Sequence, residues 1–478
     1  MTRDVNSADT SFEAMQMVSA EHMALGPLDG RYSNIGKKLS PYFSEYALVK
    51  NRVKVEVYWL IFLLENVSES WILDSHYNDI EDIKNIYSNF SYDSFLRVKE
   101  IEKETNHDVK SVEIYVGEQL KEMGMNDLVS FVHIGCTSED ITNPSYANMI
   151  STALKEVWIP TAEQLIELIS SEFAEKYADT SMLAHTHGQP ATPTTVGKEF
   201  AVYVHRMRES LENIKSIRPR AKFNGATGNY AAISVAFPDE DWPTLSKLFI
   251  EDYLGLKFNP VTTQIESHDY VCHILDGIRH FNNVLCDLDL DMWLYISKGY
   301  FKQVVVKAEV GSSTMPHKVN PIKFENSESN IDMSNAICVA LSNKLPRSRM
   351  QRDLSDSSSQ RNLGLAFGYS LQALEQTIGG LMRVTVNEEK ISEELDNKWE
   401  VLAEPIQTML RKYGVSDAYN RLKDFTRGKD ISKEAIKEFI KTLDIEGFSE
   451  EDRETLLNLS PDKYTGYASQ ITEDAIFD

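Results

Sequence analysis

Residues 268–303 read HDYVCHILDGIRHFNNVLCDLDLDMWLYISKGYFKQ, and apolar side chains recur three or four positions apart along this stretch. Phe281, Leu285, Leu288 and Met292 illustrate the spacing, which places them on one face of a helix. We therefore expect a helix over 268–303, far longer than the average of about 11–12 residues in globular proteins.

The same spacing recurs elsewhere in the chain, whereas no convincing run of alternating strand residues is present. It predicts further helices over 45–67, 145–178 with a kink at Pro160, 197–217, 325–344 and 360–384. Long helices that lie antiparallel form a bundle. The pattern therefore predicts an all-α fold with a central bundle of long helices.

Breaks in the helical pattern fall near residues 124–130 and 380–388, where glycine and asparagine interrupt it. They predict a mobile N-terminal extension (1–24), an N-terminal helical domain (25–128), a central long-helix bundle (129–382) and a C-terminal helical domain (383–478). The apolar surface of the 268–303 helix exceeds what one chain is expected to cover, which favours assembly with further copies.

The formal net charge of −24 argues against nucleic acid and anionic membranes as partners, because the average field repels both. A small anionic ligand remains compatible with this net charge if Arg, Lys and His side chains gather locally.

The longest apolar run, residues 57–64, is far shorter than the ~20 residues of a membrane span. The start of the chain has no secretory signal pattern. We expect a cytoplasmic protein.

The four cysteines show no metal-ligand spacing and are expected to be free thiols in a reducing compartment. Several segments combine glycine or proline with clustered polar side chains: 105–110 (TNHDVK), 135–140 (GCTSED), 186–193 (THGQPATP), 264–268 (QIESH), 311–320 (GSSTMPHKVN) and 347–362. Each also has an ordinary explanation, such as a helix cap or a surface charge. The residues alone leave open whether this helical protein is an enzyme that acts on a small anion.

GSSTMPHKVNP resembles the signature G-S-S-x-M-P-x-K-x-N of the fumarase, aspartase and argininosuccinate lyase superfamily. THGQPATP, TNHDVK, CTSEDI, the segment 344–362 (KLPRSRMQRDLSDSSSQRN) and LDGRY at 28–32 narrow the resemblance to the adenylosuccinate lyase family. The stretch 397–414 (NKWEVLAEPIQTMLRKYG) resembles the bacterial form of that family. The resemblance runs from about residue 25 to the end. Two alternatives are another lyase of the superfamily and a structural protein derived from such an enzyme.

The resemblance implies a nearly all-helical, three-domain subunit that assembles into a homotetramer with active sites shared between subunits. It implies elimination of fumarate from adenylosuccinate, giving AMP, and from the succinocarboxamide ribotide SAICAR, giving AICAR, in purine nucleotide biosynthesis. No metal and no organic cofactor is implied.

By the motif match, Ser312 is the general base, with Ser313 as the less favoured alternative. His187 is the general acid, and Glu325 orients it. The implied substrate contacts are Arg31, Tyr32, Asn106, His107, Asp108, Thr137, Ser138, Gln264, Lys318, Asn320, Arg352, Ser357 and Arg361. Within this set, the arginines, His107, Tyr32 and Ser357 are assigned to the ribose phosphate. Lys318, Asn320, Thr137 and Ser138 are assigned to the succinyl carboxylates. The loop at about 305–316 is expected to close over the substrate.

Overall fold

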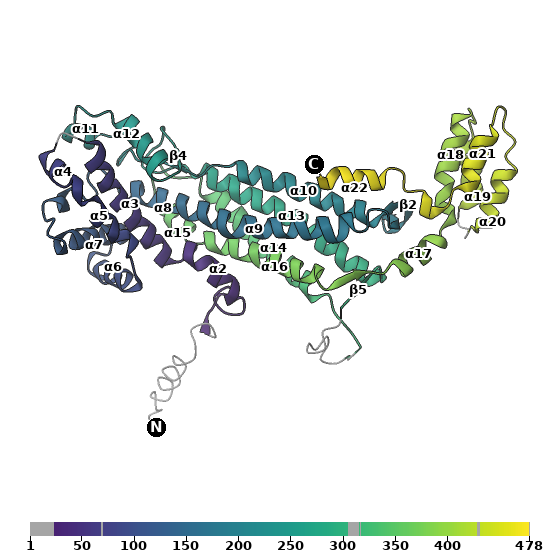
Figure 1. Ribbon diagram of the computed structural model, residues 1–478, viewed down its shortest axis with the longest axis horizontal. Coiled ribbons are helices and arrows are strands. Elements are labelled where there is room, and N and C mark those ends of the chain that lie inside the picture. The colour runs from purple at the N-terminus through teal and green to yellow at the C-terminus, as the bar shows by residue number, and fades with distance from the viewer. Residues whose placement is uncertain (1–22, 68–69, 305–314, 316, 428–430, 478) are drawn as a thin grey trace, which may run out of the picture. The chain divides into compact units, whose positions relative to one another are not determined.

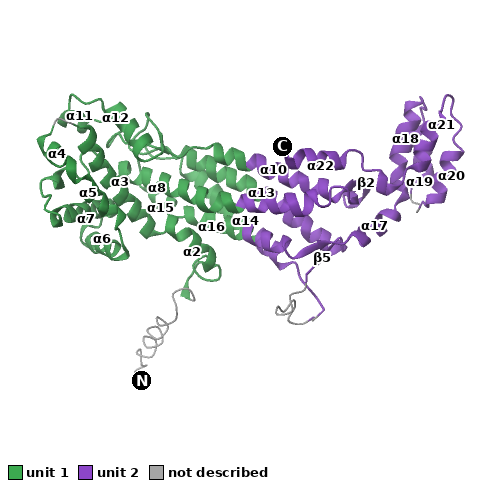
Figure 2. Ribbon diagram, in the orientation of Figure 1, with its two compact units in different colours: residues 1–161, 211–282, 329–373 green, residues 162–210, 283–328, 374–478 purple. Residues whose placement is uncertain are grey.

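The computed structural model describes residues 23–67, 70–304, 315, 317–427 and 431–477. These residues divide into two compact units, each built from three separate stretches of chain (Figure 2). Unit 1 comprises residues 1–161, 211–282 and 329–373, and unit 2 comprises residues 162–210, 283–328 and 374–478. The division cuts through the long helices and does not test the three predicted boundaries, at 24/25, 128/129 and 382/383, which stay a prediction.

Unit 1 is helical apart from one short pair of parallel strands (Figure 1). Its own elements are α2 (Ser33–Phe43), α3 (Glu45–Asn66), α4 (Trp71–Ser75), α5 (Ile80–Ser88), α6 (Tyr92–Thr105), α7 (Asp108–Glu122), α8 (Ser138–Ala153), α11 (Ile233–Ala236), α12 (Trp242–Leu248), α15 (Ser355–Gln360), β3 (Arg220–Ala221) and β4 (Lys257–Phe258).

Helix α3 lies at the centre of unit 1 and packs against α5, α7 and α8. It starts where the Ser44 side chain accepts a hydrogen bond from the Ala47 amide. Beyond that cap, apolar residues occupy nearly every side of its second half, as expected of a helix surrounded by others. Trp59 stacks on Phe62 and also contacts Phe223, which anchors the helix in an aromatic core.

The predicted long helices are present. They are α10 (Val196–Ser216), α13 (Asp269–Lys298), α14 (Ile322–Lys344) and α16 (Leu363–Leu381), and each has part of its length in unit 1 and part in unit 2. In unit 1, a Cβ on Gly277 of α13 would lie 2.7 Å from Cγ1 of Ile214 on α10. The glycine therefore permits a close approach of the two helices that no larger residue would allow.

The expected kink at Pro160 takes the form of a change in winding. Helix α8 continues through the π-helical segment η4 (Leu154–Trp158) into α9 (Ile159–Ile169), and a second π-helical segment, η5 (Ser170–Glu175), follows. Wider winding immediately before Pro160 accommodates a residue that has no amide hydrogen to donate.

Two local predictions are wrong. The helix expected over 268–303 ends at Lys298, because Gly299 adopts a left-handed conformation with φ of 79°. Residues 301–303 instead form β5 (Phe301–Gln303), antiparallel to β6 (Val384–Val386). The second error concerns THGQPATP, where no strand was expected. This segment lies in the antiparallel pair β1 (Ser181–Thr186) and β2 (Gln189–Thr195).

Unit 2 contains this hairpin and a set of short C-terminal helices. These are η7 (Trp399–Leu402), α17 (Glu388–Asp396), α18 (Ala403–Lys412), α19 (Ala418–Thr426), α20 (Lys433–Lys441), α21 (Glu450–Asn458) and α22 (Ala468–Phe477). Leu402, Ile406, Leu410, Ile436 and Ile440 belong to one buried cluster, so helices within 399–458 share a core of their own. No helix in the described ranges is long and apolar enough to cross a membrane.

Asp289 is a buried carboxylic acid in unit 2. Its Oδ1 accepts a 2.7 Å hydrogen bond from the Thr377 hydroxyl, whereas Oδ2 has no partner among the described residues. Burial raises the pKa of Asp289 well above its usual value. The folded protein therefore keeps a proton on Asp289 that the unfolded chain releases above pH ~4, and the contribution of Asp289 to stability decreases as pH rises.

We expect Asp289→Asn to become progressively more stable than the wild type between pH ~5 and ~8, because an amide stays neutral throughout. Thermal unfolding across this range measures the effect. Asp287→Asn, at an exposed position of the same helix, is the control. Parallel curves for wild type and Asp289→Asn would contradict a protonated Asp289.

Candidate active site

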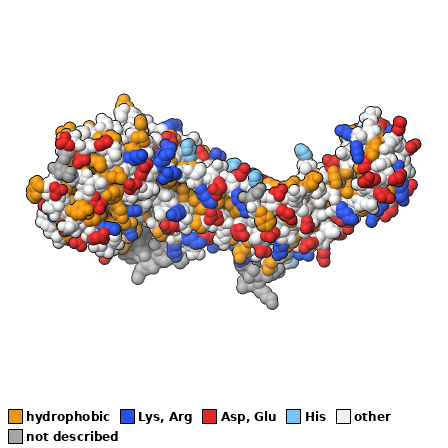
Figure 3. All heavy atoms as spheres, turned by 45° about the horizontal axis from the view of Figure 1, so that its top comes forward, with side chains coloured by type: hydrophobic (Ala, Val, Ile, Leu, Met, Phe, Trp, Pro, Cys, Tyr) orange, Lys and Arg blue, Asp and Glu red, His pale blue; other side chains and the backbone are white. Residues whose placement is uncertain are grey.

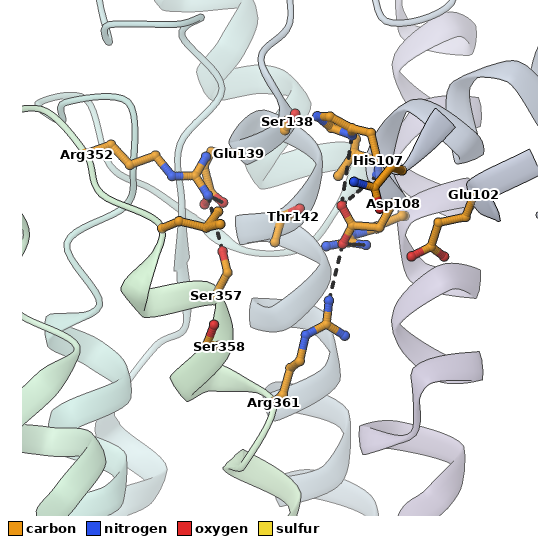
Figure 4. A pocket seen from close by; sticks show the side chains of 14 residues that line it. Glu102, His107, Asp108, Ser138, Glu139, Thr142, Arg352, Ser357, Ser358 and Arg361 are labelled. Carbon is orange, nitrogen blue, oxygen red and sulfur yellow. Dashed lines mark hydrogen bonds and ion pairs between the residues drawn. The ribbon is translucent and has the colours of Figure 1, made fainter. Parts of the chain in front are cut away.

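A pocket of about 340 Å³ opens in unit 1 between the start of α7, the start of α8 and helix α15 (Figure 4). It brings together residues from distant parts of the chain, such as Asp108 and Arg361, which are 253 positions apart. Its lining residues are Arg52, Glu102, Asn106, His107, Asp108, Val109, Ser138, Glu139, Thr142, Arg352, Leu354, Ser357, Ser358 and Arg361.

The corner between α6 and α7 supplies one wall of the pocket. Asn106 ends α6 in a left-handed conformation with φ of 49°, which asparagine tolerates better than most residues. His107 caps α7, because its Nδ1 accepts a 3.1 Å hydrogen bond from the Lys110 amide. The neutral imidazole therefore carries its proton on Nε2, where it can donate to a ligand.

The second wall is the first turn of α8. Thr137 and Asp140 form a reciprocal capping box, in which each side chain accepts a hydrogen bond from the other's backbone amide. Buried Lys222 fixes Asp140 further through a 2.9 Å ion pair. Ser138 lines the pocket from this turn, and Thr142 lines it from the next turn of α8 (Figure 4). The positive end of the helix dipole favours an anion at this position.

Arg352 supplies the third wall. Its Nη2 lies 2.9 Å from Oε1 of buried Glu139 and donates to the Ser357 hydroxyl at 3.2 Å. Its Nη1 donates to Oε1 of Gln264 at 3.3 Å, which places this predicted contact beside the pocket. Burial raises the pKa of Glu139, although the charge of Arg352 acts in the opposite direction.

Asp108 joins two arginines across the pocket. Its Oδ2 accepts from Nη1 of Arg52 at 2.8 Å and from Nη2 of Arg361 at 3.3 Å. Burial tends to raise the pKa of Asp108, but the charge and hydrogen bond of Arg52 outweigh burial and hold this pKa below its usual value. The carboxylate is thus ionised and serves as a counterion for both guanidinium groups.

Arg31 and Tyr32 do not line this pocket. They follow a turn in which the Tyr32 amide donates to the carbonyl oxygen of Pro27 at 2.6 Å. Leu28 secures the turn by packing on Gly368 of α16, where a Cβ would lie 2.5 Å from a Leu28 methyl carbon. Arg31 is exposed in unit 1.

The predicted acid lies in unit 2. His187 and Gly188 are the two central residues of the β1–β2 hairpin, with φ values of 55° and 71°. Positive φ at both positions is typical of a type I′ turn, which suits the twist of a hairpin. The turn holds His187 at the exposed tip of the hairpin.

Glu325 lies in the first turn of α14, and its Oε1 accepts a 3.1 Å hydrogen bond from the indole of Trp293. No hydrogen bond or ion pair joins Glu325 to His187 among the described residues of the chain. Lys318 is exposed and Asn320 is half-buried in the same unit. Ser312, Ser313 and most of the loop at 305–316 lie outside the described residues.

Comparison with known proteins shows which family of lyases the chain belongs to. A lyase family model matches residues 30–334, and an adenylosuccinate lyase C-terminal model matches residues 348–465. The adenylosuccinate lyase of Legionella pneumophila (strain Corby) is 46% identical over 453 residues, which cover 94% of this chain and 98% of the relative. The chain belongs to the adenylosuccinate lyase family. The adenylosuccinate lyase of Escherichia coli K12 is 44% identical over 452 residues, with the same coverage of both chains. The family resemblance read from the motifs is thereby confirmed, and the chain is a lyase.

Two solved structures share the fold at low sequence identity. A fumarate lyase from Mesorhizobium sp. BNC1 has a TM-score of 0.74 at 16% identity and covers 92% of this chain and 97% of its own. A 3-carboxy-cis,cis-muconate lactonizing enzyme from Pseudomonas putida has a TM-score of 0.70 at 18% identity, covering 92% and 96%. The predicted all-α fold of the fumarase and aspartase type is confirmed.

For this adenylosuccinate lyase family member, the pocket also contains residues that the motifs did not reveal. Arg52 and Glu102 line it beside the predicted residues, as does Glu139, which lies in the segment GCTSED but had no predicted role. Arg52 comes from the first half of α3, where an arginine next to Lys50, Asn51 and Lys54 carries no motif. A buried arginine in such a helix requires a partner, and that requirement is the signal that could have identified it.

Charge in the pocket is balanced overall. Acidic and basic side chains are also interspersed over the molecular face drawn in Figure 3, despite the net charge of −24. Three arginines line the pocket together with three carboxylates, and each of the arginines has a carboxylate partner. An entering anion must therefore share or displace partners that the arginines already have.

Proposed function

We propose that this lyase cleaves adenylosuccinate to AMP and fumarate, and SAICAR to AICAR and fumarate. The observation that carries the substrate class is the pocket of unit 1. Three guanidinium groups, the Nε2–H of His107 and the first turn of α8 surround one cavity. Such a set of donors suits the phosphate of a nucleotide.

The proposed chemistry breaks a carbon–nitrogen bond. Ser312 removes a proton from the succinyl carbon next to a carboxylate, and the electron pair forms the double bond of fumarate. The bond to nitrogen breaks, and His187 donates a proton to the departing nitrogen. Lys318 and Asn320 bind the succinyl carboxylates, on which negative charge develops during proton removal.

We also propose a homotetramer whose active sites are shared between subunits. Large apolar side chains are exposed on the outer face of α13, with exposed fractions of 45% for Leu290, 42% for Trp293 and 51% for Leu294. Burial of such side chains favours association. His187 and Glu325 form no pair within one chain, which agrees with their meeting across a subunit boundary.

A substrate panel tests the proposed reaction. Purified protein is incubated separately with adenylosuccinate, argininosuccinate and malate, and product formation is followed by absorbance. We expect turnover of adenylosuccinate alone. Turnover of argininosuccinate or malate instead would favour another lyase of the superfamily, and no turnover of any of the three would favour a structural protein.

The phosphate assignment predicts a selective effect of Arg361→Gln. We expect the KM for adenylosuccinate to rise on the order of tenfold, because a charged hydrogen-bond donor to the phosphate is lost. The dephosphorylated nucleoside, succinyladenosine, should react poorly with wild type and variant alike. An equal loss of kcat/KM for both substrates would contradict phosphate binding by Arg361.

A further inference from the structure

Arg52 is the least accessible arginine of the pocket wall. Its side chain is 6% exposed, and its Nε has no hydrogen-bond partner among the described residues. Burial of a guanidinium group is unfavourable unless a carboxylate compensates the charge. Asp108 provides that carboxylate at 2.8 Å. The position of Arg52 in a closely packed helix therefore requires an acidic partner at the start of α7.

The same oxygen of Asp108 also contacts Arg361, at 3.3 Å. Among Arg52, Asp108 and Arg361, the side chain of Arg361 is the most exposed, at 48%, and is the one that an incoming ligand reaches most easily. Asp108 is thus an internal competitor for the guanidinium group that is proposed to bind phosphate. How strongly it competes depends on how much of its charge the third member, Arg52, neutralises.

We propose that Arg52 is a positioning residue that sets the affinity of the pocket for a phosphate dianion by neutralising and holding Asp108. With Arg52 in place at 2.8 Å, Asp108 is held mainly by Arg52, and its longer 3.3 Å contact with Arg361 is the weaker one, which a ligand can replace. Without Arg52, Arg361 is the one remaining arginine partner of Asp108 in the pocket wall. The charge of Asp108 then repels a phosphate group and holds Arg361 more tightly. The choice of phosphate as the ligand rests on the proposed function.

Equilibrium binding of AMP to the full-length protein, measured by titration calorimetry with inorganic phosphate as a competing ligand, tests this role. We expect Arg52→Met to raise the Kd for AMP on the order of tenfold, as for loss of one charged hydrogen-bonding partner. Arg52→Lys keeps the positive charge but lacks the planar guanidinium group, so we expect the Kd for AMP to rise about threefold. Arg97→Met is the control, because Arg97 pairs with Glu118 on the surface of the same unit.

The decisive variant is Arg52→Met in an Asp108→Asn background. If Arg52 acts through Asp108, the carboxamide leaves nothing to neutralise, and Arg52→Met should change the Kd by less than about twofold in that background. A tenfold loss in both backgrounds would overturn the proposal, since it would mean that Arg52 contacts the ligand directly. An unchanged Kd in the Arg52→Met single variant would overturn it as well.

Two features keep the test interpretable. Removal of Arg52 alone takes away the closer partner of the half-buried Asp108 carboxylate and can destabilise the fold. In that case, Arg52→Lys is tested in the wild-type and Asp108→Asn backgrounds instead. We expect it to raise the Kd for AMP in the wild-type background and to leave the Kd almost unchanged in the Asp108→Asn background. Binding of AMP is also measured without turnover, so a wild type that binds AMP but cleaves no substrate would refute the proposed reaction and leave the role of Arg52 testable.

Discussion

The His187→Gln variant is expected to lose ~10²–10⁴-fold in kcat while it still binds AMP, because general acid catalysis typically contributes a factor of this size. The departing nitrogen needs a proton as the carbon–nitrogen bond breaks, and glutamine cannot supply one. A protonated imidazole is suited to this step, since both of its ring nitrogens carry a proton that can be donated. Steady-state kinetics and AMP titration together measure both quantities.

The conformation of His187 makes its control important. Position 187 has a positive φ, so a replacement can disturb the hairpin as well as remove the acid. His187→Asn tolerates this backbone conformation and should be as inactive as His187→Gln. His205→Gln removes an exposed histidine from α10 of the same unit and should retain full activity. Substantial activity of His187→Asn would show that another group donates the proton.

The second large effect is expected for Ser312→Ala, with a loss of kcat of ~10²–10⁴-fold and little change in AMP affinity. A serine hydroxyl is a weak base, so the enzyme must stabilise its alkoxide. Backbone amides of a glycine-containing loop and the nearby charge of Lys318 are suited to this task. The same steady-state and binding measurements apply.

Ser313→Ala is the matched control for this experiment. It removes the neighbouring hydroxyl, which we expect to satisfy loop backbone groups, and should reduce kcat far less than Ser312→Ala. If Ser313→Ala is the inactive variant and Ser312→Ala retains activity, the assignment of the base must be exchanged between the two serines.

Much of the fold could be predicted because the long helices carry an uninterrupted apolar period. The expectations for 45–67, 197–217 and 325–344 differ from α3, α10 and α14 by at most three residues at either end. In α10 the apolar residues form one stripe, whereas α3 is apolar on nearly every side of its second half, and both patterns are visible in the sequence. Local exceptions to the helical pattern were harder to predict, because one residue such as Gly299 can end a helix where the apolar pattern continues.

The β1–β2 hairpin illustrates a different limit. Prolines at 190 and 193 reduce the strand signal of the second strand, and the turn is His-Gly, which is less diagnostic than Asn-Gly. The pairing is nevertheless formed, because Met182 and Leu183 of the first strand are buried within unit 2, where β1 packs against α17. Tertiary packing therefore outweighed local propensity at the residue proposed as the acid.

Some residues of the candidate site could be predicted from the sequence, and others could not. Motif residues such as His107, Ser138, Arg352 and Arg361 could be named because each lies in a recognisable segment, and the structure places them around one pocket. Arg52 could not, because its importance depends on a partner 56 residues away. Pairing between distant side chains is a property of the folded chain that the spacing of residues in a sequence does not reveal.

The most direct test of the account is a mixture of two inactive proteins, His187→Gln and Ser312→Ala. If the acid and the base of each site come from different subunits, random hybrid tetramers contain about a quarter of sites with both groups intact. We predict that adenylosuccinate cleavage returns to about a quarter of the wild-type rate once subunits have exchanged. If exchange is verified by mass spectrometry and the mixture stays inactive, sites that take their acid and base from different subunits are contradicted.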